Sequence, residues 1–233
     1  MKRVVLLALS MGFCCVSACR PQSRSSAQTK GYFDSRHLWT TNSVSVCWEN
    51  PKPEDEVQRQ WVEKRLHAGW VAYANIALTG WKACSETETP NIRILVEDAV
   101  PHTLALGNRI DGVRNGMRLN FEFREWNKKC RPKHGQRFCI ETVALHEFGH
   151  ALGIAHEHNR ADRDSDCRKE IQGHKGDVKV GNFDRNSIMN YCFHSGYNNR
   201  LSLGDIATIQ EMYGARNQSY KKEGTDVISD DES

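Results

Sequence analysis

Apolar and polar residues alternate in three segments of the first 125 residues. In residues 43–48 every second residue is Val or Trp, and Pro51 ends the pattern. Residues 91–97 form a second mainly apolar run, and residues 119–123 alternate Leu or Phe with polar residues. A period of two places one face of a strand against a core. We therefore predict a strand in each of these three segments.

Two other segments have the spacing of amphipathic helices. Apolar residues recur every three to five positions through residues 54–79, acidic residues occupy the start of this segment, and Gly80 follows it. This pattern predicts one long helix that packs against the sheet. Residues 202–213 predict a final helix, because Ser202 is a suitable N-cap and Gly214 a suitable stop.

The composition narrows the class of protein without naming a function. The chain has 233 residues, of which 39% are hydrophobic and 26% charged, and its formal net charge is +3. These values are typical of a globular protein with one core. The charge is too small to favour nucleic acid or a membrane surface as a partner.

The two ends of the chain differ in composition from the part between them. Residues 1–19 combine Lys2-Arg3, a short apolar run and small residues, which predicts an export signal too short to span a bilayer. The sequence Val-Ser-Ala-Cys at residues 16–19 resembles a bacterial lipobox, so we expect lipid on Cys19; an ordinary signal peptide is the alternative. The polar residues 20–40 predict a tether or short pro-segment, and residues 215–233 predict a disordered tail.

Six cysteines remain after the signal segment. An exported chain meets an oxidising compartment, so we expect disulfides. Six cysteines allow fifteen pairings, and the sequence does not choose among them. Plausible pairs are Cys47–Cys84, Cys130–Cys139 and Cys167–Cys192. A second zinc site is the rival use, but no two cysteines have the Cys-x-x-Cys spacing.

The candidate chemistry lies in residues 146–156. His146 and His150 are four residues apart, which on a helix places both imidazoles on one face, within reach of a single metal ion. Glu147 flanks that ion and can accept a proton from a water beside it. Gly153 permits the chain to turn, so that His156 can return as a third ligand. Three ligands leave one position open, which is typical of a catalytic zinc site.

This eleven-residue string resembles the zinc signature of the metzincin metalloproteases. The residues that follow it, Glu157 to Asp164, resemble the astacin branch, and the N-terminal half has matrixin-like features. Ser187 to Tyr191 resembles the Met-turn of the same group. The resemblance implies that Met189 lies beneath the metal and that Tyr191 approaches the zinc or the reacting carbonyl. It also implies that Arg160 and Asp162 are structural partners.

The fold that the resemblance implies is α+β and zincin-like. A mixed, twisted sheet would carry the long helix and the zinc helix, with a cleft between an upper and a smaller lower subdomain. The catalytic domain would cover residues 41–214, with the upper part at 41–153 and the lower part at 154–214. Residues 103–107 resemble the metzincin edge strand, which pairs with the substrate backbone, although an ordinary loop is the alternative.

The function implied is that of a zinc metalloendopeptidase with one catalytic Zn²⁺. His146, His150 and His156 would bind the metal, Glu147 would be the general base, and Tyr191 would stabilise the oxyanion. We expect a protein or peptide substrate, no nucleic acid, membrane attachment only through lipid on Cys19, and a monomer. The location would be the cell envelope, as a lipoprotein, or the periplasm or medium.

Two other functions remain open at this stage. One is a catalytically inactive, zinc-bearing surface protein that only binds a partner. A general base such as Glu147 would have no function in such a protein. The other is a cell-wall peptide hydrolase with the same chemistry. Metzincin zymogens are often silenced by a Cys or Asp from a pro-segment; Asp34 is the acidic candidate here, but its surroundings match no switch motif. The remaining histidines lack the spacing of a ligand set.

Overall fold

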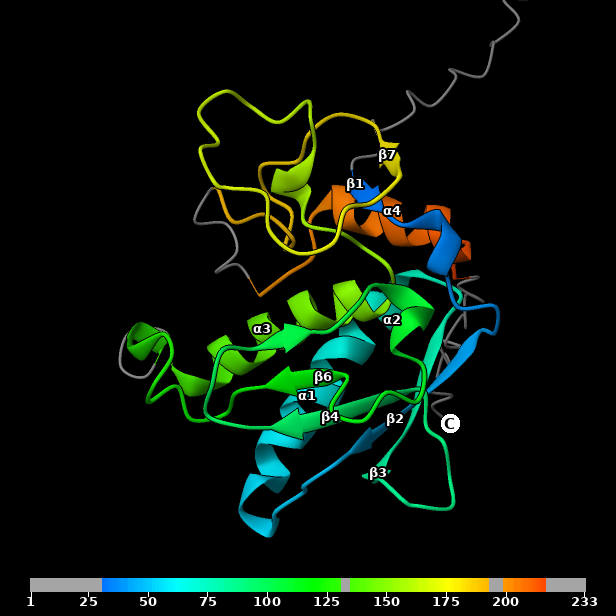
Figure 1. The fold of residues 1–233 in the computed structure, drawn as a ribbon, viewed down its shortest axis with the longest axis vertical. Coiled ribbons are helices and arrows are strands. Elements are labelled where there is room, and N and C mark those ends of the chain that lie inside the picture. The colour runs from blue at the N-terminus through cyan, green and yellow to red at the C-terminus, as the bar shows by residue number, and fades with distance from the viewer. Residues whose placement is uncertain (1–30, 131–134, 193–198, 217–233) are drawn as a thin grey trace, which may run out of the picture.

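A five-stranded sheet forms the base of the molecule. The computed structural model describes residues 31–130, 135–192 and 199–216. The strand order of the sheet is β3-β2-β4-β6-β5, and every neighbouring pair is parallel except β5 and β6 (Figure 1). The strands are β2 (Ser43–Trp48), β3 (Ala77–Ala83), β4 (Ile92–Val96), β5 (His102–Thr103) and β6 (Met117–Leu119).

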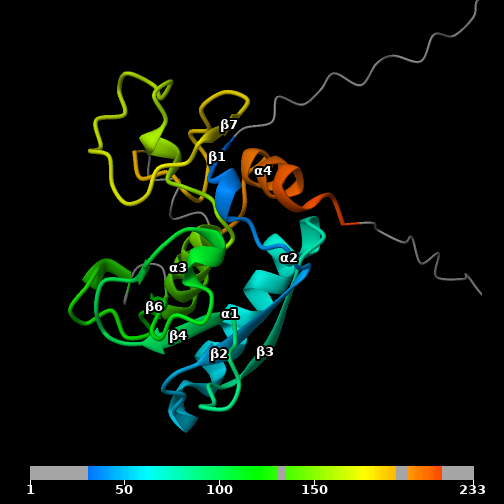
Figure 2. The same cartoon turned by 45° about the vertical axis from the view of Figure 1, so that its right-hand side comes forward.

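Two helices pack against each other and help to cover the sheet. They are α1 (Glu56–Ala68), which leads into the short α2 (Trp70–Tyr73), and α3 (Gln136–Ala151) (Figure 2). Trp70 is fully buried and donates its indole N–H to the Leu145 carbonyl of α3 at 2.9 Å. The Trp81 ring stacks on Phe148 of α3 with centroids 5.8 Å apart. Aromatic side chains from α2 and β3 thus join a largely aliphatic core to α3.

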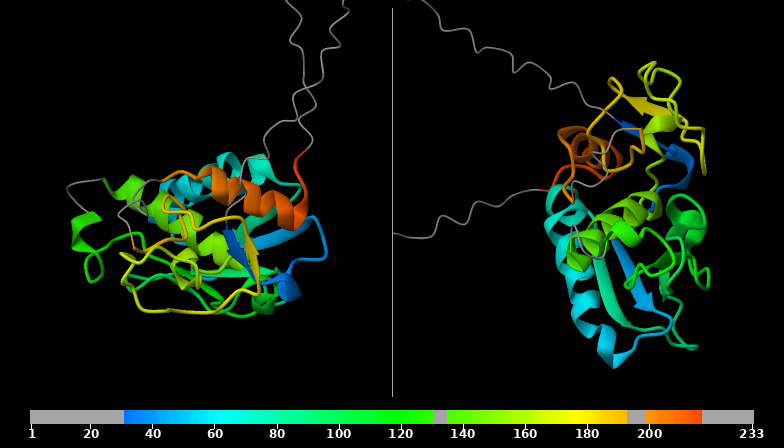
Figure 3. Two further views of the ribbon diagram at one scale, coloured as in Figure 1. Left: turned by 90° about the horizontal axis from the view of Figure 1, so that it is seen from above. Right: turned by 90° about the vertical axis from the view of Figure 1, so that its left-hand side faces the viewer.

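A smaller C-terminal part lies on the other side of α3. It contains β7 (Val178–Val180) and α4 (Leu203–Tyr213), together with β1 (Gly31–Phe33) from the start of the described chain (Figure 3). β1 pairs antiparallel with β7 and packs against α4. The short 3₁₀ helices of the described chain are η1 (Ser35–His37), η2 (Pro53–Asp55), η3 (Gly107–Ile110), η4 (Lys128–Cys130) and η5 (Glu157–Asn159).

Arg160 holds this smaller part together. The whole residue is 1% exposed, and its guanidinium donates to the backbone carbonyls of Gly31, Val180 and Gly181. The same group pairs with Asp162 at 2.8 Å, so the partnership expected from the sequence is confirmed. A planar guanidinium with five N–H donors suits this task, because a buried charge is tolerated only when its donors are satisfied.

The predicted helix over residues 54–79 is interrupted at Gly69 and wrong beyond Tyr73, where the short helix α2 ends. α1 ends at Ala68, and residues 77–83 form β3, which pairs parallel with β2. Gly80 therefore lies within a strand and does not end a helix. The apolar spacing near residue 77 fits either structure, and pairing with β2 decides for the strand.

The strand predicted over residues 119–123 is displaced along the chain, because β6 covers Met117–Leu119 and shares only Leu119 with it. β6 ends at Leu119, because the Asn120 side-chain carbonyl accepts from the backbone N–H groups of Glu122 and Phe123, at 2.8 Å each, and turns the chain. Phe121 and Phe123 are still buried, as the alternation predicted. The strands predicted at 43–48 and 91–97 are confirmed, and so is the final helix, which has a full capping box at Ser202.

The boundaries predicted for the tether and the tail need correction. Residues 31–39 belong to the fold: Trp39 is 7% exposed and donates its indole N–H to the Ala151 carbonyl at 2.8 Å. Burial opposes ionisation of Asp34, but hydrogen bonds from Arg36 and His37 lower its pKa to about 2. At the other end, Ala215 bridges to Ala74 and is not part of a free tail. The predictions for residues 1–30 and 217–233 lie outside the described residues.

All three disulfides named as plausible pairs are present. Cys47 is bonded to Cys84, Cys130 to Cys139, and Cys167 to Cys192. Disulfides persist in oxidising compartments, so the structure fits a location outside the cytoplasm. Among the described residues no helix has both the length and the apolar character to cross a membrane.

The turn at residues 187–190 packs directly beneath α3. Met189 is fully buried, and Asp205 fixes the turn by accepting from the Ser187 hydroxyl at 2.7 Å and the Ile188 N–H at 2.9 Å. A Cβ atom on Gly149 would lie 2.5 Å from the sulfur of Met189 and 3.3 Å from the ring of Trp70. Only glycine at position 149 therefore lets α3 approach the Met-turn this closely.

We predict that Gly149→Ala lowers the free energy of unfolding by about 1–3 kcal/mol, the usual cost of overpacking a core. This loss is expected even though Ala favours a helix more than Gly does. Urea unfolding followed by Trp fluorescence measures it. Because the clash is with Met189, the double variant with Met189→Ala should lose less than the sum of the two single changes. A Gly149→Ala protein as stable as the wild type would contradict this packing.

Candidate zinc site

Three histidines converge at the C-terminal end of α3. His146 and His150 lie one turn apart on the helix, as their spacing predicted. The helix ends at Ala151, and Gly153, whose φ of +106° lies in the region that glycine favours, lets the chain turn back to His156. The Nε2 atom of His156 is 3.2 Å from that of His146 and 3.1 Å from that of His150.

The backbone fixes how each imidazole is protonated. The Nδ1 atoms of the three rings lie 2.8–2.9 Å from carbonyl oxygens, which cannot donate, so each Nδ1 must carry a proton. These carbonyls belong to Ile188, Ile154 and Gln172. Each neutral ring therefore turns the lone pair of Nε2 toward the other two.

Burial keeps the three rings neutral. Burial, followed by the neighbouring His156, lowers the pKa of His146 to about 3. Burial also lowers the pKa of His150 and of His156. The lone pair of His156 lies 3.1–3.2 Å from those of the other two rings, and such lone pairs repel unless a cation lies between them.

This donor set fits a zinc ion. Zinc accepts three imidazoles in catalytic sites, and the backbone carbonyls behind the rings are the usual orienting groups. Among the described residues, these three histidines form the group of His, Cys, Asp and Glu side chains close enough to hold a metal. His158 is not in this group, although its ring lies 4.9 Å from that of His156.

Glu147 lies beside the histidines and is almost fully buried. Glu147 is 4% exposed. Burial raises the pKa of its carboxyl to about 8, although a hydrogen bond from Thr103 opposes this rise. The Thr103 hydroxyl is 2.9 Å from Oε2 and 3.0 Å from the backbone oxygen of Glu147. Nothing in the local pattern of residues indicates this contact, because Thr103 is 44 residues away along the chain.

Tyr191 approaches the site from the Met-turn. Its hydroxyl is 2.8 Å from Nε2 of His146, and its ring stacks on that imidazole at a centroid distance of 4.9 Å. Since Nε2 of His146 has a lone pair, the tyrosine hydroxyl donates. Burial, together with the charge of Glu147, raises the pKa of Tyr191, so the hydroxyl keeps its proton at neutral pH. The residue is still 41% exposed, which leaves one edge open to the cleft.

Glu157, which follows the third histidine, has found partners inside the described chain. Its Oε1 accepts from the backbone N–H of Asp184 at 2.8 Å and lies 3.6 Å from Nε of Arg160. Glu157 is 1% exposed, and burial raises its pKa to about 8, against the opposing charge of Arg160. These contacts connect the end of the zinc motif to Arg160 and to the strands whose carbonyls it binds.

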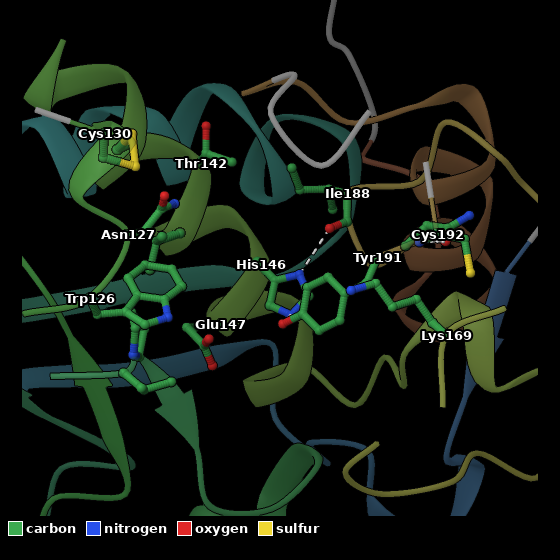
Figure 4. A pocket seen from close by; sticks show the side chains of 15 residues that line it. Trp126, Asn127, Cys130, Thr142, His146, Glu147, Lys169, Ile188, Tyr191 and Cys192 are labelled. Atoms are coloured by element: carbon green, nitrogen blue, oxygen red, sulfur yellow. Dashed lines mark hydrogen bonds between the residues drawn. A yellow bond between two sulfur atoms is a disulfide. The ribbon is translucent and has the colours of Figure 1, made fainter. Parts of the chain in front are cut away.

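A cavity of about 410 Å³ opens beside His146 and Glu147. In the view of Figure 4, these two residues lie between Trp126 and Tyr191. Most of its wall is apolar and includes Val100, Pro101, Trp126, Val143, Ile188 and the Cys130–Cys139 disulfide. No motif in the sequence assigned Trp126 to a site.

The edge of the sheet forms the upper rim of the site. β5 occupies the end of the strand order, as the resemblance implied for residues 103–107, but the paired strand is only residues 102–103. Beyond it, His174 of the C-terminal part donates from Nε2 to the Leu104 carbonyl at 2.9 Å. This contact joins the two parts of the molecule beside the metal-binding histidines. The spacing of the histidines had assigned no role to His174.

Comparison with known proteins identifies the family. The matrixin model matches residues 13–163, which is more than half of the chain, and the model of the astacin peptidase family matches residues 136–219. The zinc metalloproteinase nas-3 of Caenorhabditis elegans is 34% identical over 90 residues, which cover 34% of this chain and 31% of that protein. The chain thus spans about a third of the length of this curated relative.

Two solved structures share the fold. Myroilysin superposes with a TM-score of 0.58 at 21% identity and covers 80% of this chain and 100% of its own. A hatching-enzyme zinc protease from Oryzias latipes has a TM-score of 0.51 at 19% identity and covers 78% of this chain and 96% of its own. The mixed sheet, the zinc helix and the two family matches agree. The chain belongs to the metzincin zinc metalloproteases, the group that contains the matrixins and the astacins.

Proposed function

We propose that this chain is a zinc-dependent endopeptidase that hydrolyses peptide bonds with an activated water. The observation that carries the proposal is the convergence of three neutral imidazole nitrogens next to a buried carboxylate. His146, His150 and His156 are the metal ligands in this proposal, and Glu147 is the general base. A protein that only binds a partner has no use for a base in that position.

The chain's own groups supply the proton transfers. Zinc, when bound, acts as a Lewis acid that polarises the peptide carbonyl and lowers the pKa of the attacking water toward about 7. Glu147 accepts a proton from that water and then donates it to the nitrogen of the leaving amine. Burial raises the pKa of Glu147, which favours uptake of a proton by its carboxylate.

Tyr191 stabilises the oxyanion in this proposal. Its hydroxyl donates to Nε2 of His146, and that lone pair is the one that a metal would use. With Nε2 of His146 committed to a metal, the Tyr191 hydroxyl would be free to donate to another oxygen beside the site. A carbonyl oxygen that gains negative charge during attack is such an acceptor.

The substrate is an extended peptide that lies along β5 with a large apolar side chain in the cavity. β5 is the edge strand beside Glu147, and an edge strand can add a peptide through backbone hydrogen bonds. The cavity of about 410 Å³ falls in the range of ligand pockets and has an apolar wall. Lys169 and Glu147 are its charged lining residues, and Glu147 is committed to proton transfer.

The proposal extends to the location of the enzyme. We place it in the cell envelope as a monomeric lipoprotein anchored through Cys19. The support is the Val-Ser-Ala-Cys sequence at residues 16–19, together with three disulfides that fit an oxidising compartment.

The test of the proposed function is Glu147→Gln, which preserves the shape of the side chain but cannot accept a proton. We expect kcat for a casein-derived peptide to fall by about 10²–10⁴-fold, the usual contribution of a general base. Zinc content measured by mass spectrometry should stay at the wild-type level. Glu141→Gln is the control, because Glu141 lies on the same helix and pairs with Arg137 and Asn199.

The outcomes separate the candidate functions. Cleavage that a chelator abolishes and zinc restores supports the endopeptidase. Cleavage of cell-wall peptides but not of casein would indicate the cell-wall hydrolase. Zinc binding without hydrolysis of either substrate would indicate the binding protein. Undiminished cleavage by Glu147→Gln would refute the assigned base.

Tyr191→Phe is expected to lower kcat by on the order of 10²-fold, as for the loss of one oxyanion donor, and to leave KM nearly unchanged. Steady-state kinetics on the same peptide measure both constants. Tyr213→Phe is the matched control, because its hydroxyl donates to the Leu152 carbonyl at 2.7 Å within the core. The control should lose stability but keep kcat. An equal loss of kcat in both variants would remove Tyr191 from the mechanism.

Trp126→Ala should change specificity more than overall activity. Enlarging the cavity removes apolar contacts, so peptides with Leu or Phe beside the scissile bond should lose about 10–200-fold in kcat/KM. Peptides with Ala at that position should change little. Cleavage profiles of a peptide library for the wild type, Trp126→Ala and the control Trp61→Ala measure the difference. An unchanged preference in Trp126→Ala would show that the cavity does not take the side chain.

A further inference from the structure

The Thr103 hydroxyl reaches the Glu147 carboxylate from the edge of the sheet. It is 2.9 Å from Oε2 and 3.0 Å from the backbone oxygen of the same residue. Glu147 is 4% exposed, so water contributes little to holding its carboxylate. Within the described part of the chain, the hydrogen bond to that carboxylate comes from Thr103.

Thr103 is itself held firmly by its strand. It is in register with Met117, which is fully buried in β6, and the next residue, Leu104, donates its N–H to the Gly116 carbonyl at 2.9 Å. A β-branched side chain in a strand has restricted rotation about χ1. The sheet therefore fixes the position of this hydroxyl, whereas the Glu147 backbone belongs to α3.

We propose that Thr103 is a positioning residue for proton transfer by Glu147. By donating to Oε2, the hydroxyl sets the orientation of the carboxylate and leaves Oε1 to exchange the proton with water and amine. This inference deepens the proposed peptidase function and rests on it. It assigns a role to the side chain of an edge-strand residue whose backbone position alone would suggest only substrate pairing.

A second acceptor on the same residue keeps Thr103 in this position. A hydroxyl has one proton and two lone pairs, so Thr103 donates to one of its two acceptors at a time. Both acceptors, Oε2 at 2.9 Å and the backbone oxygen at 3.0 Å, belong to Glu147. Whichever oxygen accepts the proton, the hydroxyl stays in contact with Glu147.

The test compares Thr103→Val, which removes only the hydroxyl, with Thr103→Ser, which restores it. We expect Thr103→Val to lower kcat by about 10–100-fold, because a small misplacement of a catalytic group is costly. KM, zinc content and melting temperature should stay close to wild-type values. Thr103→Ser should recover most of kcat. The exposed Thr41, whose hydroxyl donates to the Ser43 carbonyl at 2.9 Å, provides the control variant Thr41→Val, which should behave like the wild type.

Coupling to Glu147 makes the test specific. In a Glu147→Asp background the shorter side chain cannot reach the Thr103 hydroxyl, so Thr103→Val should cause no further loss of kcat. The proposal is overturned if Thr103→Val keeps wild-type kcat, if Thr103→Ser is equally impaired, if the loss appears in KM, or if the losses in the two backgrounds are equal.

A measurement without substrate separates this inference from the proposed function. In zinc-loaded protein labelled with ¹³C at glutamate Cδ, the Glu147 signal is assigned by its absence in Glu147→Gln. This signal should shift in Thr103→Val and return in Thr103→Ser. An unchanged signal in Thr103→Val overturns the positioning role, whereas a wild-type protein that cleaves no peptide overturns the proposed function and leaves this contact to be judged by the spectrum.

Discussion

Three neutral imidazoles whose lone pairs converge, with Nε2 of His156 at 3.1–3.2 Å from the other two Nε2 atoms, are unfavourable in the absence of a cation. The fold nevertheless imposes this arrangement through backbone carbonyls at Ile188, Ile154 and Gln172. These carbonyls come from the Met-turn, the turn after α3 and a loop of the C-terminal part. Any metal bound between the rings therefore connects three segments that are distant in sequence. Because metal binding favours the folded state over the unfolded one, the site also contributes to the stability of the fold that forms it.

The C-terminal part depends more on polar and covalent contacts between separate segments than on an apolar core of its own. Residues 160–201 contain one short strand, β7, among the positions that the structure describes. Arg160 connects β1 to β7, and Arg185 pairs with Asp164 and Asp166 across the loop. The Cys167–Cys192 disulfide closes a segment of 25 residues. A crosslink over this length stabilises the fold by about 3 kcal/mol, because it lowers the conformational entropy of the unfolded chain. Ion pairs and a covalent link thus supplement the apolar burial of residues such as Ile188 and Met189 in this region.

Features that depend on the spacing of residues close together in the chain could be predicted from the sequence. The four-residue step from His146 to His150 defines one helix face, and Ser202 with Asp205 forms a capping box that is recognisable from residue types alone. Contacts between distant segments were not predictable in this way. Thr103 and Trp126 look like ordinary strand and loop residues, and only the tertiary fold brings them to the site. The missed strand β3 has the same origin, because pairing with β2 overrode a spacing that also fits a helix.

The two walls of the cleft are consequently fixed by different means. On the upper side, strand pairing to β6 fixes Thr103, and through it the Glu147 carboxylate. On the lower side, Tyr191 follows the Met-turn, which Asp205 fixes through Ser187 and Ile188. Glu147 and Tyr191, the proposed proton acceptor and oxyanion donor, are thus supported by separate parts of the molecule. The histidine cluster contacts both supports, because His146 directly precedes Glu147 on α3 and its imidazole lies 2.8 Å from the Tyr191 hydroxyl. The relative position of the two proposed groups therefore depends on how the Met-turn packs against α3.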